Sequence, residues 1–347
     1  MTIPDGGPAA PVFSGMFRML FNSLTPSLIH AGVELSVFEA LAAGPSDAAT
    51  VAAKIGAPER GVRLLLNALA SIGLLTLEGA AYALAPAARL HLIPGHPAYV
   101  GDMVAVYANS WDWKALTTLP DAVRRGGTAM TENLESPGFG YWQDFAANSG
   151  AASGRLAFLV GAALQPWVAN RETLRVLDIG CGSGAFGLSL INQRPDGHAT
   201  LLDWENILPY AREQAGRMGL SDRISEISGD MFEVPLGGPY DVVVVANLLH
   251  HLSPERGVDL LRRVRGAVAD DGRVVLVNFV ADESPSPQDA GGHMFSILAL
   301  LWTHGGQAYR PEEYAAQLDT AGYTIEASRR VPVLPVGVTI AAPAHND

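Results

Sequence analysis

The chain has 347 residues, of which 48% are hydrophobic and 17% charged, so it is long enough for two domains with buried cores. Its formal net charge of −12 at pH 7 argues against nucleic acid or an anionic membrane as a partner. Neither a signal segment nor an apolar run long enough to span a bilayer is visible, and the single cysteine, Cys181, allows no disulfide within one chain, so we expect a cytoplasmic protein.

The first predicted helix covers residues 12–23, where large apolar side chains recur at intervals of three and four residues. These side chains are Phe13, Met16, Phe17, Leu20, Phe21 and Leu24. A helix at the end of a chain cannot bury such a stripe against itself. It therefore needs a partner surface, which is either the chain's own core or a second copy of the chain.

Three helices and a short hairpin are predicted next. The helices are expected at 26–43, 47–55 and 58–72. Asp47 is a plausible N-cap of the second helix, and two short strands follow around residues 78–79. This order is typical of a winged helix, which raises the possibility of DNA binding. The third helix, however, carries only two basic residues, Arg60 and Arg63, so we interpret residues 1–100 as a winged-helix-like dimerisation domain.

Residues 101–170 are predicted to form a helical linker that is rich in aromatic side chains. Aromatic side chains between two domains often line a small-molecule pocket. We expect substrate contacts from this segment and from two positions later in the chain. The candidates are Tyr141, Trp142, Phe145, Arg155, Phe295 and Arg310.

Apolar strand-like runs and helices alternate from residue 171 to 347, which predicts an α/β domain with a mostly parallel sheet and helices on both faces. The strands are expected at 175–180, 199–203, 224–228, 240–246 and 273–279, with a closing pair near 323–331 and 335–341. In a sheet of this kind the ligand binds at the carboxyl ends of the strands.

The stretch LRVLDIGCGSG, residues 174–184, predicts a strand that ends in a glycine-rich loop before a helix. Gly180, Gly182 and Gly184 allow a sharp backbone turn and the close approach of a ligand. The spacing also satisfies the fingerprint of dinucleotide-binding proteins. The loop alone therefore leaves two classes of ligand open.

Three acidic residues near the ends of successive strands favour one of these classes. Asp178 immediately precedes the loop, Asp203 follows the next strand at the distance where an acid reaches ribose hydroxyls, and Asp230 follows a third strand. A carboxylate before the loop would repel a pyrophosphate but suits a ligand that carries ammonium and sulfonium groups. The acids therefore favour S-adenosylmethionine over NAD.

The glycine loop resembles motif I, D-x-G-x-G-x-G, of the class I methyltransferases. Two further stretches resemble the two-domain small-molecule O-methyltransferases: VVVVANLLHHLSPE at 242–255 and GGQAYRPEEYAAQLDTAGY at 305–323. The resemblance implies a Rossmann-like methyltransferase domain at 171–347, a homodimer joined through the N-terminal domain, and a small-molecule substrate. It implies cofactor contacts from Asp178, Gly180, Gly182, Gly184, Asp203, Trp204, Asp230, Met231, Phe232 and Asn247.

The same resemblance places the general base of O-methyl transfer at His250, because an imidazole can take the proton of a phenol near neutral pH. Two positions depart from the family pattern. His251 stands where the family has an aspartate, and Ala308 stands where it has the glutamate that orients the base. These departures argue against ordinary phenol methylation.

An alternative hypothesis uses the histidines to hold a metal ion. The chain resembles a subgroup of bacterial 2-oxo-acid C-methyltransferases in which histidines from these two loops bind an iron-group or zinc ion. In this chain the ligands would be His250 and His304, with His293 as the runner-up and His251 and Tyr309 as further catalytic candidates. The metal would stabilise an enolate whose β-carbon takes the methyl group.

Metal-assisted C-methylation of a 2-oxo acid is therefore the preferred sequence-based hypothesis, with Arg155 or Arg310 facing the substrate carboxylate. The alternative is O-methylation of a phenolic or polyketide-type metabolite with His250 as the base. More distant alternatives are a cofactor-bound catalyst that transfers no methyl group and a winged-helix regulator.

Overall fold

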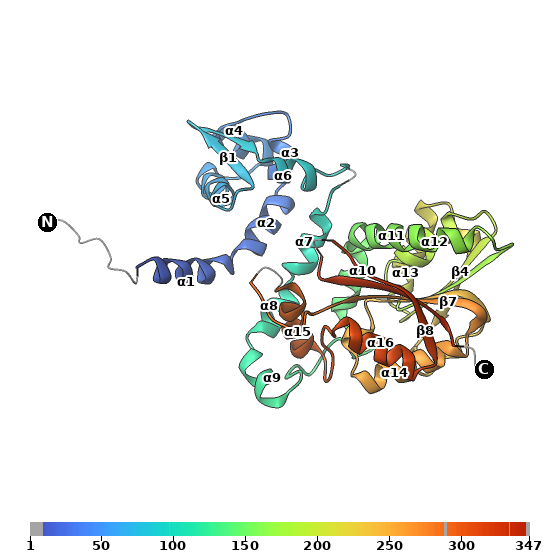
Figure 1. Cartoon of the computed structure of the whole chain (residues 1–347). Helices are drawn as coiled ribbons and strands as arrows, with labels where there is room; N and C mark the ends of the chain where they lie inside the picture. The colour runs from blue at the N-terminus through green and yellow to red at the C-terminus, as the bar shows by residue number, and fades with distance from the viewer. Residues whose placement is uncertain (1–9, 97, 288–289, 333, 345–347) are drawn as a thin grey trace. The chain divides into compact units, whose positions relative to one another are not determined.

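The computed structural model describes residues 10–96, 98–287, 290–332 and 334–344. The chain forms two compact units, Met1–Asn109 and Ser110–Asp347 (Figure 1). Of the predicted linker at 101–170, residues 101–109 fall in the first unit and residues 110–170 in the second. No helix in the described ranges is both long enough and apolar enough to cross a membrane.

The first unit contains the predicted helices and hairpin. Its elements are α1 (Ala10–Asn22), α2 (Thr25–Glu34), α3 (Val37–Ala40), α4 (Ala48–Ile55), α5 (Glu59–Ser71), β1 (Leu75–Glu78), β2 (Ala81–Leu84), α6 (Pro86–His91) and α7 (Gly101–Tyr107). The N-cap prediction at Asp47 is confirmed, because its carboxylate accepts a 2.7 Å hydrogen bond from Thr50 N. The unit encloses its own core, in which Phe38, Leu66 and Leu69 are fully buried.

The prediction of one helix over 26–43 is wrong. Ser36 adopts a left-handed conformation with φ of 54°, and this residue separates α2 from α3. A left-handed residue cannot continue a right-handed helix. The break turns the chain so that Phe38 packs beneath α2, where a Cβ on Gly32 would lie 2.8 Å from the Phe38 ring.

The apolar stripe of α1 is exposed. Met16, Met19, Leu20, Phe21 and Leu24 each leave at least half of their surface accessible. The predicted stripe also included Phe13 and Phe17, whose side chains lie outside the described residues. The described part of the stripe is therefore not buried on the core of this chain.

The second unit is built on a sheet of seven strands in the order β5-β4-β3-β6-β7-β9-β8. The strands are β3 (Leu174–Ile179), β4 (Gly197–Asp203), β5 (Ile224–Ser228), β6 (Tyr240–Ala246), β7 (Val268–Phe279), β8 (Tyr323–Arg330) and β9 (Val336–Pro343). The first five in this order are parallel, and β9 runs antiparallel to both β7 and β8. The predicted α/β class is confirmed.

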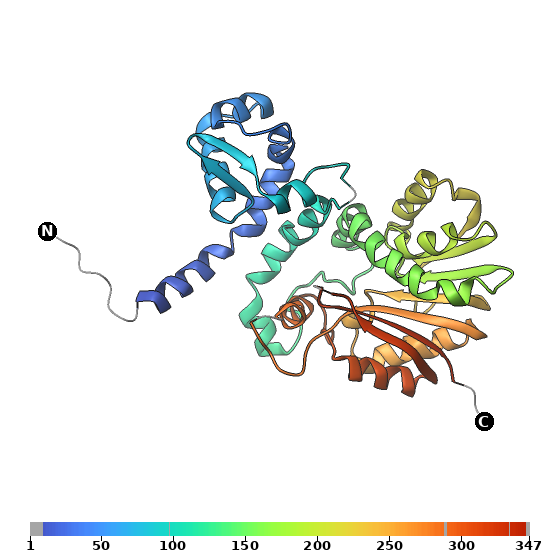
Figure 2. The ribbon, with the colours of Figure 1, turned by 45° about the horizontal axis from the view of Figure 1, so that its top comes forward.

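Helices cover both faces of this sheet (Figures 1 and 2). One face carries α11 (Gly150–Val168), α12 (Ala185–Asn192) and α13 (Leu208–Arg217), and the other carries α14 (Pro254–Arg265) and α16 (Pro311–Thr320). The valines of β6 alternate between the two cores: Val242 and Val244 face the first, and Val243 and Val245 face the second. Burial on both faces explains the continuous apolar run in this strand.

A third group of helices frames one edge of the unit. It comprises α8 (Ser110–Leu116), α9 (Leu119–Arg125), α10 (Gly140–Asn148) and α15 (Gly291–Trp302). Trp302, at the end of α15, is 2% exposed and donates a 2.7 Å hydrogen bond from its indole nitrogen to Asp112. His293 lies inside α15, in its first turn.

Candidate active site

A cavity of about 410 Å³ opens at the carboxyl ends of β3, β4, β5 and β6. The chain leaves β3 toward β4 and later returns to place β6 on the other side of β3, so the strand order reverses at this point. In open α/β sheets the ligand binds in the crevice outside such a reversal. The cavity lies where the sequence predicted the cofactor site.

The glycine loop forms one wall of the cavity. Gly180, Gly182 and Gly184 have φ values of 61°, 54° and 74°, a region that costs glycine little and other residues more. Gly180 and Gly182 line the cavity, whereas Gly184 lies behind it as the N-cap of α12. A Cβ on Gly184 would lie 3.2 Å from Ala211 Cβ in α13, so this glycine serves the packing of the two helices.

Asp203 connects the end of β4 to the glycine loop. Its two carboxylate oxygens accept 2.8 Å hydrogen bonds from Gly182 N and Trp204 N. Burial raises its pKa to about 6, although both hydrogen bonds act in the opposite direction. The side chain lines the cavity, and each carboxylate oxygen keeps a second lone pair for a ligand hydroxyl.

Asp178 lies beneath the loop and is not among the residues that line the cavity. Its side chain is 1% exposed and accepts a 2.7 Å hydrogen bond from Gly187 N in α12. Burial raises its pKa to about 7. The sequence analysis placed this carboxylate against the cofactor, but in the structure it fastens the end of β3 to the following helix.

The loop after β5 forms the opposite wall. Asp230, Met231 and Phe232 all line the cavity, and Asp230 accepts a 2.8 Å hydrogen bond from Phe232 N. The Arg256 guanidinium carbon lies 3.6 Å from the centre of the Phe232 ring. Arg256 also lines the cavity and was missed in the sequence, because an arginine in the first turn of α14 has no distinguishing pattern.

Two further predicted cofactor residues, Trp204 and Asn247, line the cavity. Asn247 follows β6 and has φ of 55°, an uncommon conformation for a residue other than glycine. Its backbone N–H donates a 2.6 Å hydrogen bond to Val277 O in β7. This bond holds the strained residue at the rim of the sheet.

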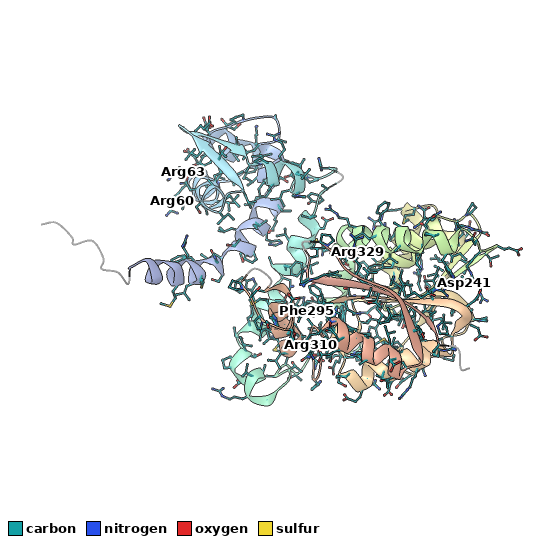
Figure 3. The ribbon with its side chains drawn as sticks, viewed as in Figure 1. Arg60, Arg63, Asp241, Phe295, Arg310 and Arg329 are labelled. Carbon is teal, nitrogen blue, oxygen red and sulfur yellow. The ribbon has the colours of Figure 1, made fainter. Side chains whose placement is uncertain are left out.

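His250 points into the core and does not line the cavity. Its side chain is 1% exposed, and its Nδ1 accepts a 3.1 Å hydrogen bond from Phe279 N. The ring packs against Phe295, which Figure 3 shows on α15, with 4.6 Å between ring centres. Burial holds the pKa of His250 well below its usual value, with a further contribution from His251.

His251, the next residue, faces the cavity instead. Its ring centre lies 5.5 Å from that of Trp142, and its buried Nδ1 has no hydrogen-bond partner among the described residues. Burial lowers its pKa to about 4, so the imidazole is neutral at pH 7. The sequence analysis placed the general base at His250, but only His251 of the two neighbouring histidines lines the cavity.

His304 also lines the cavity and is paired with Glu135, another lining residue. Its Nδ1 lies 2.7 Å from Glu135 Oε2, and its backbone N–H donates a 2.8 Å hydrogen bond to Glu135 Oε1. No sequence pattern indicates Glu135, because the two residues are 169 positions apart.

Tyr309 does not line the cavity and instead connects two loops. Its hydroxyl lies 2.6 Å from Leu252 O and 3.1 Å from Gly305 O, and the side chain is buried. Burial raises the pKa of this phenol, so it stays protonated. The residue joins the loop that carries the histidine pair to the loop that follows α15.

The predicted metal site is not supported by this arrangement. His250 uses Nδ1 inside the core and does not reach the cavity wall, whereas His304 presents Nδ1 to Glu135. His293 lies within α15, where its Nε2 is buried. Across the ranges that the structure describes, no three His, Cys, Asp or Glu side chains come together as a metal-binding group.

Of the predicted substrate residues, Trp142 and Phe145 line the cavity. Tyr141 stacks on Phe139 instead, with 6.2 Å between ring centres. The two predicted arginines lie elsewhere: Arg155 is exposed on α11, and Arg310 pairs with Glu313 at 3.2 Å at the start of α16 (Figure 3).

Comparisons with known proteins agree with the fold. A family model described as the O-methyltransferase domain matches residues 159–324, and one described as the O-methyltransferase dimerisation domain matches residues 17–94. Mouse (Mus musculus) acetylserotonin O-methyltransferase is 31% identical over 340 residues, covering 92% of this chain and 85% of the mouse protein.

Two other proteins extend the comparison. The solved structure of a candidate O-methyltransferase from Nostoc punctiforme has a TM-score of 0.86 and 30% identity, covering 94% of this chain and 98% of that one. The L-tyrosine C(3)-methyltransferase of Streptomyces lavendulae is 27% identical over 361 residues, covering 97% of this chain and 96% of that protein. With both family models matched and these relatives spanning nearly its whole length, the chain belongs to the O-methyltransferase family.

Proposed function

We propose that the protein transfers the methyl group of S-adenosylmethionine to a hydroxyl oxygen of a small aromatic metabolite. The observation that carries this proposal is the hydrogen bond from Gly182 N to the Asp203 carboxylate. It places a carboxylate and a glycine loop on the same cavity wall. When bound, S-adenosylmethionine supplies an electrophilic methyl group on a positively charged sulfur. Membership of the O-methyltransferase family supports transfer to oxygen.

The cavity suits a cationic cofactor with hydroxyl groups better than a dinucleotide. Asp203 and Asp230 line it, and Arg256 is the only Lys or Arg among its described lining residues. A pyrophosphate would meet two carboxylates and no lysine beside the glycine loop. Asp203 would hold the ribose hydroxyls, and Gly180 and Gly182 leave room for the ligand to approach the backbone.

The acceptor side of the cavity is aromatic and carries two histidines. Trp142 and Phe145 offer flat apolar surfaces, and His251 and His304 offer imidazoles. The arginines expected to meet a 2-oxo acid do not line the cavity, since Arg310 is paired with Glu313 and Arg155 lies on an exposed part of α11. This arrangement favours a neutral phenol-like acceptor over a 2-oxo acid.

Transfer to an aromatic ring carbon is the second candidate reaction. It is supported by the similarity to L-tyrosine C(3)-methyltransferase, whose name describes methylation of a phenolic ring at carbon. An acceptor of this kind would occupy the same aromatic surface. Loss of the phenolic proton would activate either the oxygen or the ring carbon beside it, so only the product distinguishes the two reactions.

We further propose that the protein acts as a homodimer through its first unit. The match to the dimerisation-domain model over 17–94 and the exposed apolar face of α1 support this assembly.

The experiment is to incubate the purified protein with methyl-labelled S-adenosylmethionine and a panel of hydroxyindoles, naphthols, simple phenols and 2-oxo acids. We expect label on the oxygen of at least one aromatic acceptor, identified by NMR of the product. Label on carbon would favour the second candidate. Calorimetry with S-adenosylhomocysteine and NAD tests the cofactor separately, and tight binding of NAD alone would contradict the proposal.

A further inference from the structure

Two loops that are distant in sequence are joined beside the cavity. Thr128 N donates a 2.9 Å hydrogen bond to Thr303 O, and Leu134 N donates a 3.1 Å hydrogen bond to Trp302 O. The Thr128 hydroxyl adds a buried 2.7 Å bond to Leu301 O. These bonds hold the segment before α10 against the end of α15. The backbones that carry Glu135 and His304 are therefore held next to each other.

Glu135 contacts His304 through both of its carboxylate oxygens. One oxygen accepts the His304 backbone N–H at 2.8 Å, and the other lies 2.7 Å from Nδ1 of the ring. An ionised carboxylate can only accept, so Nδ1 must carry the proton. Nε2 then holds a free lone pair, and it has no hydrogen-bond partner among the described residues.

The other two histidines near the site lack this arrangement. Nδ1 of His250 accepts from Phe279 N, and Nδ1 of His251 has no partner, so neither ring is oriented by an acid. His250 is buried in the core, and His251 is partly buried with an enclosed Nδ1, whereas 68% of the His304 side chain is exposed. An exposed imidazole can pass a proton to water after each turnover, which a ring enclosed in the core cannot do.

We propose that Glu135 and His304 form a carboxylate–imidazole pair in which His304 removes the proton from the acceptor hydroxyl. The inference rests on the proposed function and assigns its general base. His304 Nε2 takes the proton while the O–H bonding electrons stay on the acceptor oxygen, which then forms the new bond to the methyl carbon. The electron pair of the broken carbon–sulfur bond stays on sulfur, and His304 later releases its proton to water.

In this pair Glu135 is a positioning residue, because both of the hydrogen bonds found for its carboxylate in the described structure go to His304. It fixes the tautomer with the proton on Nδ1 and stabilises the imidazolium that forms during proton transfer. The other charged or titratable side chains that line the same cavity are Asp203, Asp230, His251, Arg256 and Cys181. A pH profile must therefore be compared between variants rather than assigned from the wild type alone.

The kinetic test compares His304→Asn, Glu135→Gln and Glu135→Asp with the wild type, using an acceptor found in the labelled panel. A general base typically contributes about 10²–10⁴-fold, so we expect His304→Asn to lower kcat within that range while KM changes little. Glu135→Gln should lower kcat by about tenfold or more, and Glu135→Asp should recover part of the loss. S-adenosylhomocysteine affinity should stay unchanged in all three variants.

Glu132→Gln provides the matched control. Glu132 lies on the same loop and is exposed, and no hydrogen bond or ion pair is found for it in the described structure, so this variant removes the same charge without touching His304. It should keep the wild-type rate. A series of acceptors of increasing acidity extends the test. A phenol that is already ionised needs no base, so the loss of kcat in His304→Asn should disappear with such an acceptor.

A spectroscopic readout tests the pair without any acceptor. Nitrogen-15 NMR of the imidazole rings, assigned with His304→Asn, should show His304 protonated on Nδ1 in the wild type and mainly on Nε2 in Glu135→Gln. Wild-type His304 protonated on Nε2 would overturn the proposal. So would unchanged kcat in both His304→Asn and Glu135→Gln, whereas a wild type that methylates no hydroxyl acceptor overturns the proposed function itself.

Discussion

At the scale of single residues, the sequence predicted chemical types better than orientations. Asp178 and Asp203 both end strands before a ligand-binding loop, yet only Asp203 lines the cavity. Strand ends do not reveal whether a side chain points toward the rim or under the next helix. The same ambiguity affected His250 and His251, since a one-residue shift within the short turn at Leu249–His251 decides which ring reaches the cavity.

Asp203 gives a prediction about cofactor binding. Replacing it with alanine removes the acceptor of two backbone N–H groups and the carboxylate that we propose binds the ribose hydroxyls, so S-adenosylhomocysteine affinity should weaken by about 1–3 kcal/mol. Its pKa of about 6 also predicts weaker binding as pH falls from 7.5 to 5.5, because the protonated carboxyl loses charge-assisted hydrogen bonds. Calorimetry at both pH values measures this, and Asp203→Asn should show little change between them.

Asp178 gives a prediction about stability. Its pKa of about 7 in the folded protein exceeds the value of about 3.9 for an exposed Asp, so the fold favours the protonated form. The stabilisation is complete below pH 4 and is lost as pH rises through 7. Asp178→Asn keeps an acceptor for Gly187 N, so it should stabilise the protein at pH 8 by at least about 1.4 kcal/mol, one pKa unit.

Urea unfolding of Asp178→Asn and the wild type at pH 5 and pH 8 checks this expectation. Asp203 has a raised pKa as well, so the variant should retain part of the wild-type pH dependence rather than none. An equal pH dependence in both proteins would mean that Asp178 does not titrate in this range.

At the scale of elements, the sequence predicted the sheet closely, and its clearest signal was β6, which contains a run of four buried valines. The exceptions have local causes. β7 begins at Val268 rather than 273, since Asp270, Asp271 and Gly272 look like a turn but continue the strand through a register shift. The break at Ser36 carries no glycine or asparagine to mark it.

The contact between Glu135 and His304 could not be predicted from the sequence. It depends on the docking of α15 against α8 and α9, and no local pattern reports a contact across 169 positions. Residues close to a motif, such as Asp203, are found by spacing, whereas this pair is found only in the folded chain.

Tyr309 gives a prediction at the element scale. Its hydroxyl joins the loop after Leu252 to the loop at Gly305, so Tyr309→Phe should lower the free energy of unfolding by about 0.5–1.5 kcal/mol. The variant should keep the pH profile of the wild-type rate, because the phenol stays protonated and lies outside the cavity wall. Chemical unfolding measures the first effect and a pH–rate profile the second. If the variant's profile lacks one ionisation that the wild-type profile shows, Tyr309 takes part in the reaction.

At the scale of the whole molecule, we expect the exposed face of α1 to form the interface of the proposed homodimer. Met19 and Leu20 are 73% and 67% exposed in the single chain. In a dimer a second chain would cover these apolar side chains and remove them from water. Replacing both with glutamate places charges in that interface, and burying unpaired charges is strongly unfavourable. Light scattering should therefore show a dimer for the wild type and a monomer for the double variant.

Phe158 on α11 serves as the control for this assembly, because it is 69% exposed and belongs to the second unit. Phe158→Glu should remain dimeric if the interface is formed by the first unit. Since every described residue that lines the cavity belongs to the second unit, we expect the monomeric double variant still to bind S-adenosylhomocysteine. A double variant that stays dimeric would show that α1 is not in the interface, and one that loses cofactor binding would show that the cavity depends on assembly.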